Sequence, residues 1–176
     1  MFTTNYNPIY AVFVKAKKAT DKKPFSFQRF AQASDQILSD VIILPSRAKY
    51  FTQVSELIYD STLPLRANVE HILMENRSRF PASLIDNLML PTLFTGAVEL
   101  AKRRVEANYK VAVPTYYRNE ICLLLPLSLI NPQKTDLALA IKKYNGYYTA
   151  KTCLTLDMAY NDARLIARPD TDWLIP

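Results

Sequence analysis

The hydrophobic pattern of the chain changes at Pro114, from helical spacing before it to continuous apolar runs after it. Upstream of this proline, apolar residues recur every three or four positions over residues 26–39, 65–76 and 91–108. This spacing predicts three helices. Pro91 stands in the first turn of the last one, a position that proline favours, and this supports the predicted start of that helix.

Nearly continuous apolar runs make up the last part of the chain. Residues 121–130 and 136–144 do not alternate between polar and apolar positions, which indicates strands covered on both faces. Asn145-Gly146 predicts a hairpin turn of type I′, and the return strand is expected over residues 147–156. A short helix then closes the pattern. The expected fold class is α+β, with a mixed or antiparallel sheet, a C-terminal hairpin and about four helices.

One further strand is expected near the N-terminus. Residues 8–14 form a short apolar run, and a lysine-rich segment from Lys15 to Lys23 follows it. We interpret this segment as a solvated turn, with contact to nucleic acid as the alternative.

Length and composition restrict the kind of protein. The 176 residues, 49% of them hydrophobic, suit a single domain over residues 1–176 with one well-buried core. Only two glycines occur, Gly96 and Gly146, so no glycine-rich loop is available for a phosphate. Cys122 and Cys153 lie in apolar runs without metal-ligand spacing, which predicts buried thiols. No apolar run is long enough to span a bilayer, and we expect a cytoplasmic protein without membrane contact.

Basic and aromatic side chains concentrate in residues 102–118 of a chain whose net charge is +6. Cations there would neutralise phosphates, and tyrosine rings would stack on bases. The C-terminal end of a helix also favours cations through its dipole, and this is the alternative, structural explanation for Lys102 and Arg103. From this segment, the residues predicted to contact RNA or a nucleotide are Lys102, Arg103, Tyr109, Lys110, Tyr116 and Tyr117.

The C-terminal segment carries a second candidate site. Asp157, Asn161, Arg164 and Arg168 are spaced so that a helix places them in one line, which we call the polar stripe. The arginines would hold phosphate oxygens, and Asp157 would act as an acid or base or as a Mg²⁺ ligand. A phosphodiesterase or nuclease is therefore the alternative function. In a third interpretation Asp157 caps the helix, the stripe is an internal network, and the protein is a structural or interaction domain.

His71 is the only histidine and the natural candidate for acid–base catalysis near neutral pH. Glu75 follows one helical turn later and could orient the ring. A single histidine excludes a two-histidine metal site within one chain. We expect no metal or other cofactor, apart from Mg²⁺ if the protein is a nuclease, and the sequence does not indicate an oligomeric state.

Several short motifs, in fixed order and spacing, resemble one family. They are Pro8-Ile-Tyr-Ala, Leu57-Ile-Tyr-Asp60, Arg66-x-Asn68-x-x-His71, Arg79-Phe-Pro81, Asn108-Tyr-Lys110, Leu123-Leu-Leu-Pro-Leu127 and the block from Leu154 to Asp170. The family is the bacterial domain-of-unknown-function family numbered 3825, and the resemblance covers essentially the whole chain.

The resemblance adds an expectation about the partner, and the chain departs from the family pattern in two ways. Members are similar to modules found beside small RNA-binding domains of the LOTUS and cold-shock kinds, which favours RNA as the partner. The family pattern has a second asparagine where this chain has Asp162. It also has an additional N-terminal portion, so the chain resembles a shortened or C-terminal member, whose site a missing N-terminal portion or a fused RNA-binding domain would complete.

Overall fold

The computed structural model describes residues 3–5, 7–20, 23–46 and 48–175. The chain forms two compact units, each with most of its contacts inside itself. They are Met1–Ala48 and Lys49–Pro176, which we call the N-terminal unit and the C-terminal unit. Both hydrophobic clusters lie in the C-terminal unit. The core expected from the length of the chain is therefore built by that unit alone.

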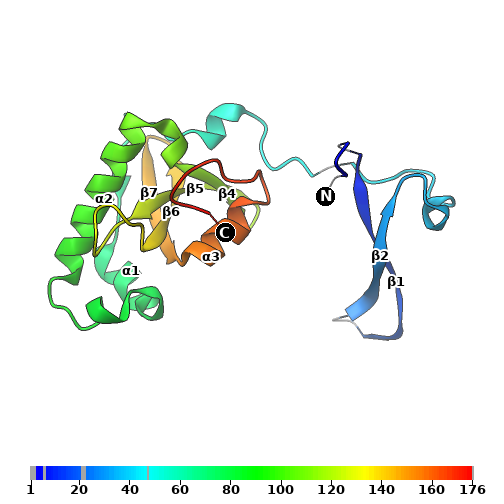
Figure 1. The fold of residues 1–176 in the computed structure, drawn as a ribbon, viewed down its shortest axis with the longest axis horizontal. Coiled ribbons are helices and arrows are strands. Elements are labelled where there is room, and N and C mark those ends of the chain that lie inside the picture. Colours follow the sequence, from blue (N-terminus) through cyan, green and yellow to red (C-terminus); the bar gives the residue numbers. More distant parts are fainter. Residues whose placement is uncertain (1–2, 6, 21–22, 47, 176) are drawn as a thin grey trace. The chain divides into compact units, whose positions relative to one another are not determined.

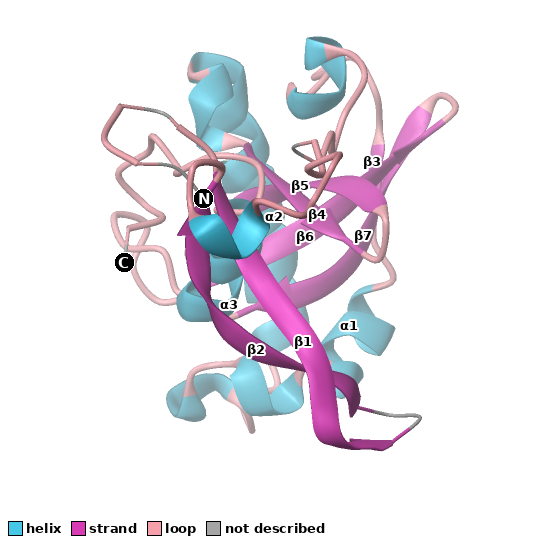
Figure 2. Cartoon of the chain, turned by 90° about the vertical axis from the view of Figure 1, so that its right-hand side faces the viewer, coloured by secondary structure: helices cyan, strands magenta, loops and turns pink. Residues whose placement is uncertain are grey.

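The N-terminal unit consists mainly of an antiparallel hairpin, β1 (Ile9–Thr20) with β2 (Lys23–Gln32), drawn as a long twisted ribbon in Figure 2. The strand predicted over residues 8–14 is confirmed, and it continues through much of the lysine-rich segment. Residues 21 and 22 of that segment lie outside the described residues. The helix predicted over residues 26–39 is wrong, because the first half of this range is β2 and only η1 (Gln36–Leu38) is a short 3₁₀ turn.

A β-bulge explains this wrong prediction. Val12 lies opposite Arg29 and Phe13 lies opposite Phe27, so β2 contains one extra residue at this point. The extra residue brings Phe27 and Phe30 to the same face although they are three positions apart. A spacing of three on one face is also what a helix produces, and the strand therefore has a helical pattern.

The C-terminal unit is built on a five-stranded mixed sheet in the order β3-β7-β6-β5-β4. Only β3 runs parallel to its neighbour. The strands are β3 (Leu65–Arg66), β4 (Val113–Tyr117), β5 (Glu120–Leu127), β6 (Leu137–Tyr144) and β7 (Tyr147–Leu154). The predicted α+β class and the C-terminal hairpin of β6 and β7 are confirmed.

The turn between β6 and β7 differs in type from the prediction. Gly146 has a φ of 83°, but Asn145 does not have the positive φ that type I′ also needs, so the predicted turn type is wrong. The turn between β4 and β5 has two positive φ values instead, 49° at Arg118 and 64° at Asn119. An arginine is thus fixed in a left-handed conformation that side-chain-bearing residues rarely adopt.

Three α-helices flank the sheet within the described residues, α1 (Val69–Glu75), α2 (Leu90–Ala107) and α3 (Leu156–Ala163). Helices α1 and α2 cover one face and α3 lies on the other (Figure 1). Strand β5 shows why its sequence is continuously apolar: Leu123 and Leu125 pack in the cluster with α1 and α2, whereas Leu124 packs under α3. Helix α2 agrees with its prediction, and α1 is shorter than predicted because Asn68 caps it.

A basic pocket as the candidate functional site

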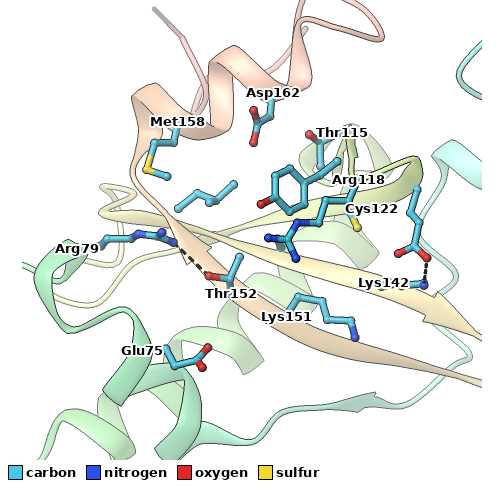
Figure 3. A pocket seen from close by; sticks show the side chains of 14 residues that line it. Glu75, Arg79, Thr115, Arg118, Cys122, Lys142, Lys151, Thr152, Met158 and Asp162 are labelled. Atoms are coloured by element: carbon cyan, nitrogen blue, oxygen red, sulfur yellow. Dashed lines mark hydrogen bonds and ion pairs between the residues drawn. The ribbon is translucent and has the colours of Figure 1, made fainter. Parts of the chain in front are cut away.

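Helix α3 covers only part of its face of the sheet. Its eight residues extend about 12 Å along the helix axis, whereas five strands side by side span roughly 19 Å. The uncovered part of this face is a pocket of about 470 Å³, shown in Figure 3. Its charged lining residues are Glu75, Arg79, Arg118, Glu120, Lys142, Lys151 and Asp162, and the others are Thr115, Tyr117, Cys122, Ala140, Thr152, Leu154 and Met158.

Arg79 is held at one side of this pocket by a polar network. Its Nη1 lies 2.8 Å from Oδ1 of Asn76 and 3.1 Å from Oγ1 of Thr152, and it also donates to the carbonyl of Cys153. That carbonyl belongs to β7 beyond the point where the two-residue strand β3 stops pairing with it. Among the described residues, all the hydrogen bonds of this guanidinium involve Nη1, so Nε and Nη2 remain as donors.

Arg118 enters the pocket from the turn between β4 and β5. Its guanidinium carbon lies 5.2 Å from the centre of the Tyr117 ring, and Figure 3 shows the side chain extending over the sheet. The described residues provide no carboxylate partner for it. The left-handed backbone at this residue therefore places an unneutralised cation beside an exposed aromatic ring.

Two lysines approach from the hairpin of β6 and β7. Lys142 is paired with Glu120, and this hydrogen bond raises the lysine pKa. Lys151 donates to the Tyr144 hydroxyl over 2.9 Å and has no carboxylate partner among the described residues. Ala140 lies opposite Thr152 while the next residue, 141, lies opposite 150, so Lys151 is the extra residue of a β-bulge. Bulges commonly redirect side chains beside functional sites.

Acidic and hydroxyl groups complete the lining. Asp162 has no ion-pair partner among the described residues, and burial raises the pKa of its carboxyl. Thr115 is 2% exposed, and within the described part of the chain its Oγ1 finds no hydrogen-bond partner. A buried hydroxyl without a partner is destabilising. Burial also raises the pKa of the Cys122 thiol, which favours its protonated form.

The predicted polar stripe lies outside this pocket. All four of its residues, Asp157, Asn161, Arg164 and Arg168, are exposed. The interpretation of the stripe as an internal network is therefore wrong. Thr155, rather than Asp157, caps the helix, because its side chain accepts from the backbone N–H of Met158.

The predicted basic and aromatic segment is dispersed, and part of it is already paired. Lys102 bonds Glu99, Lys110 bonds Asp170 over 3.0 Å, and the Tyr116 ring packs on Tyr50 at a centroid distance of 4.7 Å. Arg103 and Tyr109 are exposed, and neither side chain forms a hydrogen bond or ion pair with the residues that the structure describes. Of the residues predicted as site residues, Tyr117 is the one that lines the pocket.

His71 has the neighbour that the sequence predicts. Its Nε2 lies 3.3 Å from a carboxylate oxygen of Glu75, and Glu75 lines the pocket. Within the described residues, no group of three histidine, cysteine or acidic side chains is arranged to hold a metal.

The pocket cations were not predicted as site residues. Arg79, Arg118, Lys142 and Lys151 come from a 3₁₀ turn, a tight turn and two strands, so only the tertiary fold joins them. One local signal was available: Asn119 can adopt a positive φ readily, so the Arg118-Asn119 pair is itself a turn signal.

No helix in the described part of the chain is long and apolar enough to cross a membrane. No curated protein and no solved structure matches the sequence. A family match does exist, and it extends over residues 1–173, nearly the whole chain. A match of this extent gives no support to the expectation of a shortened or C-terminal member. The chain belongs to the family described as the domain of unknown function DUF3825.

Proposed function

We propose that the C-terminal unit binds a nucleoside phosphate in the pocket, either as a free nucleotide or as the phosphorylated end of an RNA strand. The observation that carries the proposal is the meeting of Arg79, Arg118 and Lys151 at one pocket, where none of the three forms an ion pair with a carboxylate of the described residues. Its volume of about 470 Å³ is within the range of small-ligand sites.

The phosphate would be held by the two guanidinium groups and the lysine. Planar guanidinium groups bind phosphate oxygens through two donors at once, and such charge-assisted bonds are about twice as strong as neutral ones. Arg79 is already fixed through Nη1 by Asn76 and Thr152. Little side-chain entropy would then be lost when its remaining donors bind an anion.

The base and ribose would occupy the rest of the pocket. Tyr117 offers an aromatic ring that is 53% exposed, and Leu154 and Met158 offer apolar contact. The Asp162 carboxylate would accept hydrogen bonds from the N–H groups of a base or from a ribose hydroxyl.

The proposal is tested by calorimetric titration with the four nucleoside 5′-monophosphates and with inorganic phosphate as baseline. A short RNA with a 5′-phosphate, compared with its 5′-hydroxyl form, separates a strand end from a free nucleotide. Arg118→Met should weaken binding about tenfold or more, because charge-assisted hydrogen bonds are lost. Arg103→Met is the matched control, since Arg103 is also exposed but lies outside the pocket. Equal affinities of the two variants, or no binding of any probe at low salt, would contradict the proposal.

A phosphodiesterase activity is the second candidate, and the contact of the His71 imidazole with the Glu75 carboxylate favours it. This pair brings an imidazole to the border of the pocket, at 3.3 Å from a lining carboxylate. An imidazole near a bound phosphate can transfer protons at neutral pH. The test is a gel of the phosphorylated RNA after incubation with Mg²⁺: cleavage that His71→Gln abolishes supports catalysis, and intact RNA leaves binding as the function.

A further inference from the structure

The hairpin of the N-terminal unit exposes four phenylalanines on one face, which we call the aromatic face: Phe13, Phe25, Phe27 and Phe30. Directly opposed residues of two strands share a face, and Phe13 lies opposite Phe27. Lys15 lies opposite Phe25 in the same way, and residue 11 lies opposite Phe30. Because residues 11, 13 and 15 alternate along β1, all these side chains point to one side.

These rings form a patch on the surface of the unit instead of a core. Phe13 and Phe27 have centroids 5.7 Å apart, and those of Phe27 and Phe30 are 5.0 Å apart, yet each ring is at least 50% exposed. Ala31 and Leu38 are the buried hydrophobic residues among those described in this unit. Contiguous apolar surfaces of this kind mark interaction sites in soluble proteins.

Charge indicates what kind of partner the aromatic face fits. The sequence of residues 1–48 has seven basic and three acidic residues, so this quarter of the chain carries +4 of the total +6. Lys15 lies on the aromatic face itself, and Lys17 is exposed two positions further along β1. Two copies of so positive a unit would repel each other, whereas a polyanion would be attracted.

We infer that the aromatic face binds single-stranded nucleic acid, with bases stacked on the exposed rings and phosphates beside the lysines. Unpaired bases offer flat faces that stack on aromatic side chains whatever the sequence, and lysines release the counterions of the backbone. This surface belongs to the N-terminal unit and shares no residue with the pocket. The inference therefore does not rest on the proposed function.

The test uses the full chain and a fluorescein-labelled single-stranded RNA with 5′-hydroxyl ends, in anisotropy titrations at several salt concentrations. Phe27→Leu keeps an apolar side chain but removes the ring, and should weaken binding about fivefold or more. The double variant Phe13→Leu/Phe27→Leu should weaken it about 25-fold. Phe27→Tyr should bind like the wild type. Val14→Ala is the control, since Val14 lies on the opposite face of the same strand.

The same assay has further readouts. Lys15→Gln should reduce the slope of log affinity against log salt by about 0.7, the value for one phosphate contact on a single strand. Arg118→Met, which alters the pocket, should leave this affinity unchanged, and Phe27→Leu should leave mononucleotide binding unchanged. Far-UV circular dichroism establishes that each variant keeps its strands.

Three results would overturn the inference. The first is no binding of the RNA at low salt by the folded wild type. The second is a Phe13→Leu/Phe27→Leu variant that binds like Val14→Ala. The third is self-association in light scattering that the leucine variants retain, without RNA binding, because leucine would preserve an apolar contact between proteins but not base stacking.

Discussion

Replacement of Asn76 by alanine should destabilise the C-terminal unit by about 3 kcal/mol. Asn76 is 2% exposed, and its Nδ2 donates to the Ile72 carbonyl over 2.8 Å. Its Oδ1 accepts from the Thr152 hydroxyl over 2.6 Å and from Arg79 over 2.8 Å. The alanine variant loses all three bonds while their partners remain in place.

The magnitude follows from the chemistry of these bonds. Neutral hydrogen bonds contribute about 1 kcal/mol each and one from a guanidinium about 1.5–3 kcal/mol. Arg79 keeps its hydrogen bond of 3.1 Å to Thr152 and its hydrogen bond to the Cys153 carbonyl. The loss of stability is therefore near the lower end of the summed values. For a unit of this size, such a loss lowers the melting temperature by about 10 °C.

Urea unfolding followed by tryptophan fluorescence measures this loss. Trp173 is the only tryptophan and lies in the C-terminal unit, where its indole N–H donates to the Val111 carbonyl over 2.9 Å. Arg164→Ala is the control, because Arg164 is exposed and should change stability by no more than about 0.5 kcal/mol. The reasoning is refuted if Asn76→Ala loses under about 1 kcal/mol, the value of a single bond, or if the two variants lose equally.

Three other predictions use the titratable groups. Burial raises the pKa of Tyr59 to about 12 and also raises that of Tyr148. The free energy of unfolding should therefore keep its full value below pH 10 and decrease as the pH rises from 10 towards 12, which urea unfolding at increasing pH would measure. Burial raises the pKa of Cys153 to about 12 and also raises that of Cys122, so both thiols should react with a disulfide reagent only after denaturation. Burial likewise raises the pKa of Asp162, so Asp162→Asn should raise the melting temperature at neutral pH, and this gain should shrink as the pH falls through the raised pKa, where the aspartate becomes protonated.

Elements with long local patterns could be predicted from the sequence. Helix α2 has eighteen residues with consistent spacing and a proline in its first turn, and β5 and β6 are apolar without interruption. Strand β2 could not be predicted in this way, because its bulge depends on the register with β1. The spacing of apolar residues shows which of them share a face only where the backbone is regular, and a bulge removes that regularity.

The polar stripe shows a different limit. Helix α3 carries Asp157 and Asn161 as predicted, but it ends at Ala163, so Arg164 and Arg168 lie beyond it. A line of polar residues on a surface helix normally faces solvent. The pocket is lined by Met158 and Asp162, each one position further along, which turns the relevant face by about 100°. Periodicity can therefore show that residues share a face, but the position of α3 on the sheet decides which face meets a ligand. If the pocket binds a nucleoside phosphate, Asp162→Ala should change the base preference and Asp157→Ala should not. The opposite result in the calorimetric titration would show that the ligand binds at the polar stripe instead of in the pocket.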